Sequence, residues 1–210
     1  VVDTEKRKDM VFIDWVEVNN MVALQVLWWW ALDSATSIAN RVGCSEKEAK
    51  WKLLRDKVRE RLVELYWDDS ASLWRASSMS EDGFSRHACI LSVVSGLVEP
   101  NDAGRIAEAL LQDGVDDLQG SVNMRPVATP YMKMFECLAL IRANKLHVAM
   151  DKMRQYWSAM QDNGASTFYE AYDGNKTQAS FYGRPFGNSL CHAWSSVSFV
   201  IIVDVLKHPS

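Results

Sequence analysis

Residues 21–32 read MVALQVLWWWAL, an apolar run in which Gln25 is the one polar residue. The run lies within residues 17–42, which contain neither proline nor glycine and therefore predict one long helix. A helix that is apolar nearly all round has to be enclosed by other helices. The run falls short of the ~20 apolar residues that a membrane span requires. It therefore predicts a central helix in an all-α domain.

Outward from this run, strongly apolar helical segments alternate with strongly charged ones, and about seven are predicted in all. The apolar segments are residues 17–42, 84–98, 129–142 and 187–206, and the charged segments are residues 45–67, 101–113 and 145–161. Successive αα-hairpins would place the charged helices in an outer ring and the apolar helices in an inner ring. Inner helices of such a double ring run parallel, so we expect the loops before them to gather at one end.

Several predicted helix ends have the residues typical of helix caps. Ser45 with Glu48 predicts a capping box, and Thr129–Pro130 predicts an N-cap followed by proline in the first turn. Gly43 and Gly164 follow predicted helix ends. The intervening loops, residues 68–83, 114–127 and 162–187, are longer than hairpin turns and suggest function. Helix N-termini near them would favour oxygen-rich ligands.

Composition excludes several classes of protein. The net charge of −4 and the interleaving of basic and acidic residues argue against a nucleic-acid partner, and no apolar run is long enough to predict a membrane partner. The sequence contains no nucleotide-binding fingerprint, no GxSxG elbow and no standard metal-ligand spacing, so we expect no cofactor and no metal. The four separated cysteines predict small buried side chains, and they slightly favour the cytoplasm over secretion.

The most distinctive motifs are GASTFYE at residues 164–170 and SLCHAWS at residues 189–195. Together with FIDW at 12–15 and TPYMK at 129–133, they resemble the α-L-rhamnosidases and related six-hairpin glycosidases. That family has a Gly-Ala-Thr-Thr-aromatic-aromatic-Glu motif and a Ser-Leu-x-His segment. The resemblance covers nearly the whole chain, although Ser166 replaces the first threonine.

The resemblance implies that residues 1–210 are one helical domain, the C-terminal portion of a catalytic (α/α)6 barrel. The chain begins at Val1 with no visible leader, and we expect the parent protein to be longer at its N-terminus. The expected partners are a rhamnoside or related glycoside, and either the missing half of the barrel or further copies of the chain.

In the family, the glutamate that closes the first motif is the general base of inverting hydrolysis, and it matches Glu170. The family's general acid has no counterpart among these residues. The implied substrate-binding residues are Asp14, Trp15, Tyr131, Thr167, Tyr169, His192 and Trp194.

Structural alternatives remain open at these positions. Glu170 can cap a turn or pair with a neighbour such as Arg184, Asp14 can be an N-cap or a loop ion pair, and His192 can be a satisfied structural residue. The whole chain can also be a non-catalytic helical-hairpin module that binds a sugar or a protein surface. Most of the nine tryptophans, those at 28–30, 51 and 157 included, are expected in the core rather than in a sugar site.

Overall fold

The computed structural model describes residues 13–14, 21–77, 83–112, 124, 127, 129–172 and 189–207. Its helices confirm the predicted all-α class, and their contacts group them into two units. The first unit contains α1 (Met21–Arg41), α2 (Ser45–Tyr66), α3 (Arg86–Ser95) and α4 (Pro100–Leu111). The second contains α5 (Pro130–Arg142), α6 (Leu146–Asp162), α7 (Ser198–Lys207), the 3₁₀ helix Ala193–Val197 and Asp14.

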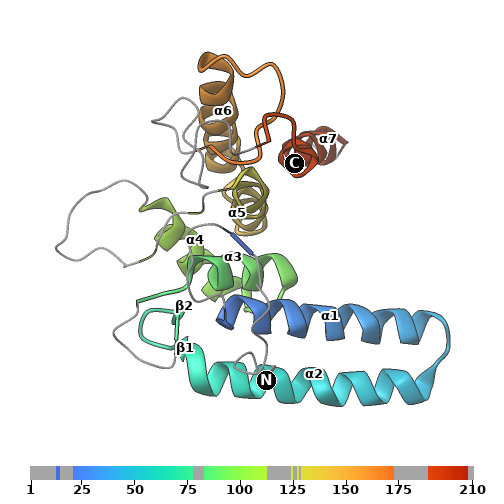
Figure 1. The fold of residues 1–210 in the computed structure, drawn as a ribbon. Coiled ribbons are helices and arrows are strands. Elements are labelled where there is room, and N and C mark those ends of the chain that lie inside the picture. The colour runs from blue at the N-terminus through green and yellow to red at the C-terminus, as the bar shows by residue number, and fades with distance from the viewer. Residues whose placement is uncertain are drawn as a thin grey trace. The chain divides into compact units, whose positions relative to one another are not determined.

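In the first unit, α1 packs against α2 on one side and α3 on another (Figure 1). An ion pair between Arg55 of α2 and Asp33 of α1, with an N–O distance of 2.8 Å, joins the two helices of the hairpin. Helix α3 is buried along nearly its whole length. The Arg86 guanidinium donates to the carbonyl of Leu110 at 2.8 Å and so satisfies a carbonyl in the last turn of α4.

The tryptophan triplet of α1 does not enter the core as a block. Trp29 is only 7% exposed, whereas the neighbouring Trp28 is 38% exposed. Successive residues of a helix point about 100° apart, since one turn takes 3.6 residues, so three in a row cannot face one neighbour. Trp51 and Trp157 are half-buried. The prediction that these side chains are core residues is therefore confirmed for Trp29 and wrong for Trp28.

A two-stranded antiparallel hairpin, β1 (Trp67–Asp68) and β2 (Leu73–Trp74), follows α2 where only a loop was expected. The Asp68 carboxylate accepts hydrogen bonds from the amides of Ser70 and Ala71 and pairs with Arg75 at 2.8 Å. The hydrogen bond from the Ser70 hydroxyl and these other contacts hold the pKa of Asp68 well below its usual range. Asp68 therefore has a structural role in closing this turn.

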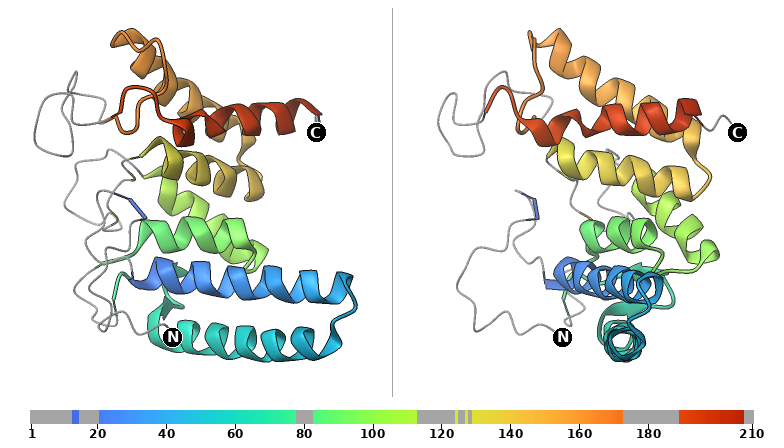
Figure 2. Two further views of the ribbon diagram at one scale, coloured as in Figure 1. Left: turned by 45° about the vertical axis from the view of Figure 1, so that its right-hand side comes forward. Right: turned by 90° about the vertical axis from the view of Figure 1, so that its right-hand side faces the viewer.

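In the second unit, α5 and α6 form a hairpin, and α7 lies beside α5 (Figure 2). Met132, Cys137 and Leu140 of α5 and Met153 and Met160 of α6 are buried. Glu136 is also fully buried in α5, where its carboxylate pairs with Lys133 at 3.2 Å and with Lys152 of α6 at 3.1 Å. None of the described helices is long and apolar enough to cross a membrane.

The predicted caps are partly correct. Thr129 is the N-cap of α5, and its hydroxyl accepts from the amide of Met132 at 3.2 Å. Gly43 and Gly164 have φ angles of +73° and +88°, as expected after helix ends. The capping box is wrong, because Cys44 occupies the N-cap position of α2, which places Ser45 one residue too far into the helix. Glu48 instead accepts from the Asn40 side chain at 3.0 Å.

Two further corrections concern the cysteines and the last helix. Cys89 and Cys137 are buried as predicted, but Cys44 and Cys191 are exposed. The last predicted helix began at residue 187, whereas α7 begins at Ser198 after the 3₁₀ helix Ala193–Val197. Residues 189–192 are not helical, and their main chain is hydrogen-bonded to an irregular segment that follows α6. This pairing builds the candidate site.

Candidate active site

Glu170 lies on an irregular segment, residues 165–172, which runs antiparallel to residues 189–192 and is joined to them by main-chain hydrogen bonds. The Glu170 amide donates to the carbonyl of Ser189, and the His192 amide donates to the carbonyl of Phe168, both at 2.8 Å. The Thr167 hydroxyl donates to the carbonyl of Leu190, so this exposed side chain also joins the two segments. The motifs at residues 164–170 and 189–195 are thus hydrogen-bonded to each other.

The carboxylate of Glu170 is half-buried and is held by the segment opposite. The Ser189 amide donates to Glu170 Oε2 at 2.8 Å, so Glu170 and Ser189 are joined through both a main-chain and a side-chain hydrogen bond. A hydrogen bond from a backbone amide to a carboxylate is charge-assisted and therefore strong. It holds the carboxylate in one orientation. Arg184, the alternative partner of Glu170, lies outside the described residues.

The 3₁₀ helix Ala193–Val197 binds the main chain of the same segment. The Trp194 indole donates to the carbonyl of Glu170 at 2.9 Å, and the Ser195 hydroxyl donates to the carbonyl of Tyr169. Trp157 of α6 in turn donates to the carbonyl of Ser195 at 3.1 Å. Glu170 and Tyr169 are thereby connected to a packed helix.

Three aromatic rings meet beside Glu170. The indole of Trp194 stacks on the imidazole of His192 with ring centroids 4.2 Å apart, and on the phenol of Tyr131 with centroids 6.0 Å apart. Tyr131 stands in the first turn of α5, whereas Trp194 and His192 stand just before α7. Within this unit, α5 and α7 therefore begin at the same end, as the double-ring arrangement predicts.

Burial affects the chemistry of Tyr131. It raises the pKa of the hydroxyl above its ordinary value, because the phenolate is less well solvated than the phenol. Like an unperturbed tyrosine, Tyr131 is therefore a phenol at neutral pH and can donate a hydrogen bond.

Asp14 is buried and accepts from the amide of Thr129 at 3.1 Å. It therefore satisfies a backbone donor at the start of α5, which is a structural contact of another kind than the N-cap or ion pair named as alternatives. Trp15 lies outside the described residues.

The contact between Asp14 and Thr129 predicts a difference between two substitutions. Asp14→Ala should lower the free energy of unfolding by about 1 to 3 kcal/mol, because it leaves a buried amide without its acceptor. Asp14→Asn retains an amide oxygen in the same place and should cost less than half as much. Urea unfolding of both variants measures the difference. Equal stability of the alanine variant and the unmodified protein would show that this hydrogen bond contributes nothing.

The chain matches the model of the bacterial alpha-L-rhamnosidase 6 hairpin glycosidase domain over residues 3–199. It belongs to this family. Among solved structures, the chain resembles a rhamnosidase from Klebsiella oxytoca with rhamnose bound, with 26% identity and a TM-score of 0.74. A GH78 family rhamnosidase of Bacillus sp. GL1 has the same fold, with 18% identity and a TM-score of 0.69. No curated protein sequence matches the chain.

These alignments cover most of the rhamnosidase domain but only part of each relative. The alignment with the Klebsiella rhamnosidase includes 89% of the present chain and 34% of that protein's chain. The alignment with the Bacillus rhamnosidase includes 88% of the present chain and 20% of that protein's chain. The chain thus spans about a third and a fifth of the two proteins.

The structure brings several of the predicted site residues together. Direct hydrogen bonds and ring contacts link Glu170, Trp194, His192 and Tyr131, while Tyr169 is joined to the 3₁₀ helix through Ser195, and Thr167 bonds the segment opposite. Sequence reasoning missed Ser189 and Ser195 as supporting residues. Both stand in the SLCHAWS motif, but they act on or through main-chain groups, which residue type alone does not reveal.

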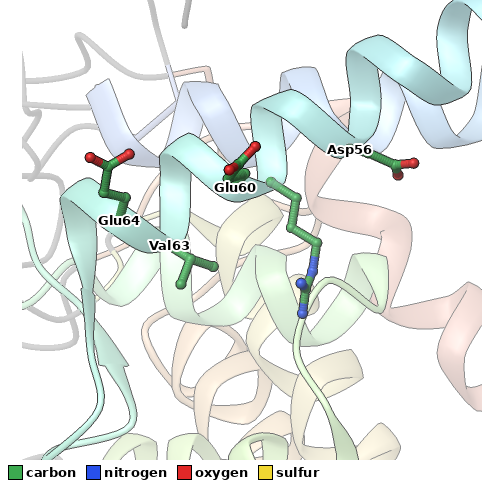
Figure 3. Close-up of a pocket in the computed structure, with 5 residues that line it drawn as sticks. Asp56, Glu60, Val63 and Glu64 are labelled. Carbon is green, nitrogen blue, oxygen red and sulfur yellow. The ribbon is translucent and has the colours of Figure 1, made fainter.

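The other features that the structure describes involve other residues. Among the residues that the structure describes, no group of three or more His, Cys, Asp and Glu side chains is arranged to hold a metal ion. A hollow on α2 is lined by Asp56, Arg59, Glu60, Val63 and Glu64 (Figure 3). All five come from one helix in the first unit, and none belongs to the predicted site.

Proposed function

We propose that the chain is part of a glycoside hydrolase that cleaves terminal α-L-rhamnosides with inversion, and that Glu170 is its general base. Family membership supports the substrate class. The residue assignment rests on two observations: the Glu170 carboxylate is held by the Ser189 amide, and the Glu170 main chain is bonded to Trp194, whose ring stacks on His192 and Tyr131. A carboxylate can take a proton from water while aromatic rings cover the apolar face of a sugar.

Inversion sets a geometric requirement on this site. Two carboxyl groups stand roughly 6.5 to 9.5 Å apart, so that the base can activate a water on the face of the sugar opposite the leaving group. The general base has to keep its position while that water attacks. The Ser189 amide and the paired segments give Glu170 such support.

The sugar-binding roles follow from the chemistry of the neighbouring side chains. Tyr131 and His192 are proposed to donate hydrogen bonds to sugar hydroxyls, and Trp194, with Trp15, to cover the apolar face of the ring. Thr167 and Tyr169 flank Glu170 on its own segment. Asp14 supports the start of α5, on which Tyr131 stands, and is proposed to reach the sugar through its carboxylate.

We further propose that the chain is the C-terminal portion of a larger (α/α)6 barrel and supplies the base side of the site. The chain spans about a third of the Klebsiella rhamnosidase. The general acid would then come from another part of the protein. Residues 1–210 alone should therefore hydrolyse a nitrophenyl α-L-rhamnoside no faster than buffer does. Glu170-dependent release of nitrophenol by these residues alone would contradict this division of the site.

The substrate class is tested with the full-length protein and a panel of nitrophenyl glycosides. We expect nitrophenol release from the α-L-rhamnoside and rates at least about tenfold lower with α-L-fucoside and β-D-glucoside, because one misplaced hydroxyl leaves a buried donor or acceptor unsatisfied. Rhamnose binding by calorimetry without hydrolysis of any glycoside would contradict the proposal and favour a non-catalytic binding module.

A further inference from the structure

We infer that Trp194 and Ser195 are positioning residues for the general base. They would act by holding the main chain of Tyr169 and Glu170. This inference rests on the proposed function of Glu170, and it assigns Trp194 a role beyond contact with the sugar. Two consecutive side chains of the 3₁₀ helix bind two consecutive carbonyls, Trp194 that of Glu170 at 2.9 Å and Ser195 that of Tyr169.

The need for such support follows from the local backbone. Residues 165–172 follow the end of α6 and form neither a helix nor a strand, so the hydrogen bonds of a regular element do not hold their carbonyls. The pairing with residues 189–192 engages the amide of Glu170 and the carbonyl of Phe168. Buried carbonyls require a hydrogen-bond donor, and at Tyr169 and Glu170 side chains supply it. The position of the Glu170 Cα therefore depends on Trp194 and Ser195.

The two donors are themselves fixed by packed helices. Ser195 is fully buried, its amide donates to the carbonyl of His192 at 3.1 Å, and its carbonyl accepts from Trp157 of α6. The Trp194 ring stacks on His192 and on Tyr131 of α5. A site supported by secondary-structure elements is held more accurately than one on an isolated loop. The base segment is thus anchored to both helices of the α5–α6 hairpin.

The kinetic consequence concerns turnover more than binding. A displacement of about 1 Å in a catalytic group can lower a rate by about 100-fold, because the attacking water is no longer aligned. Loss of one of two supports should produce a smaller effect. A residue that only contacts the sugar would instead change the binding of the ground state, and therefore KM.

Trp194→Phe and Ser195→Ala in the full-length protein test the inference on a nitrophenyl α-L-rhamnoside. The phenylalanine retains a ring in the aromatic stack but removes the N–H donor, and the alanine removes the hydroxyl without adding volume. We expect kcat to fall about tenfold in each variant while KM changes less than threefold. Trp74→Phe is the matched control, because its buried indole N–H has no acceptor among the described residues. It should retain the original kcat.

Combination with Glu170→Gln shows whether the effect passes through the base. If Trp194 and Ser195 act by positioning Glu170, their substitution should not lower the residual rate of the Glu170→Gln protein any further. A tenfold fall in that background as well, or an unchanged kcat in both single variants, would overturn the inference. Glu170→Gln alone tests the proposed function separately, since an unchanged rate there refutes the base assignment whatever the other variants do. If Trp194→Phe does not fold, the kcat of Ser195→Ala, alone and combined with Glu170→Gln, tests the inference.

Discussion

Glu170→Gln in the full-length protein is expected to lower kcat for a nitrophenyl α-L-rhamnoside by about 1,000-fold, within the range typical of a general base. Glutamine is nearly isosteric with glutamate, and its side-chain oxygen can still accept from the Ser189 amide. It cannot accept a proton from the attacking water. KM should change less than threefold, because the binding surface is retained. Steady-state kinetics at neutral pH measures both constants.

A matched control separates this effect from a general response to lost charge. Glu64 is exposed on α2 and pairs with Arg61 on the same helix, outside the predicted site. Glu64→Gln should therefore leave kcat and KM unchanged. Equal rates in the Glu170→Gln variant and the unmodified protein would exclude Glu170 as the base.

The second large effect is expected in stability. Glu136 is fully buried and joins Lys133 on its own helix to Lys152 of α6. Glu136→Ala should lower the free energy of unfolding by about 3 to 5 kcal/mol, because it leaves two desolvated ammonium groups without their counter-charge. The melting temperature should fall by roughly 10 °C. Urea unfolding followed by circular dichroism measures the change in free energy.

Replacement of the whole cluster provides the comparison for this prediction. The variant Lys133→Met, Glu136→Leu, Lys152→Met removes all three charges and keeps the side-chain volumes similar. The free energy of unfolding of this triple variant should be higher than that of Glu136→Ala and close to that of the unmodified protein, because no buried charge remains unpaired. If Glu136→Ala unfolds at the same urea concentration as the unmodified protein, the buried ion cluster does not stabilise the α5–α6 hairpin.

The fold could be predicted largely from the sequence because burial follows side-chain periodicity. The alternation of apolar and charged segments correctly predicted the helices, and Thr129–Pro130 marked the start of α5 within one residue. The prediction failed where contacts in the folded chain override the local sequence pattern. Residues 189–192 were predicted as helix but pair with residues 165–172, which are distant in the chain. Trp28 was placed in the core by composition, although its angular position on α1 exposes it.

The sequence selected residues that lie close together in the structure, but it did not predict the hydrogen bonds that connect them. Resemblance to a family selected Glu170, His192, Trp194 and Tyr131, and these residues do come together. The bonds from Ser189 to the carboxylate and from Ser195 to the Tyr169 carbonyl were not predicted. Every residue except proline has a backbone N–H, so only the folded chain shows which amide bonds the carboxylate.

The stereochemistry of hydrolysis tests most directly whether Glu170 activates water or attacks the sugar itself. Proton NMR can follow the first minutes of hydrolysis of a nitrophenyl α-L-rhamnoside by the full-length protein, before the released sugar mutarotates. Activation of water on the face opposite the leaving group predicts that β-L-rhamnose appears first. Initial release of α-L-rhamnose would mean retention through a covalent intermediate and would contradict the role of Glu170 as a general base.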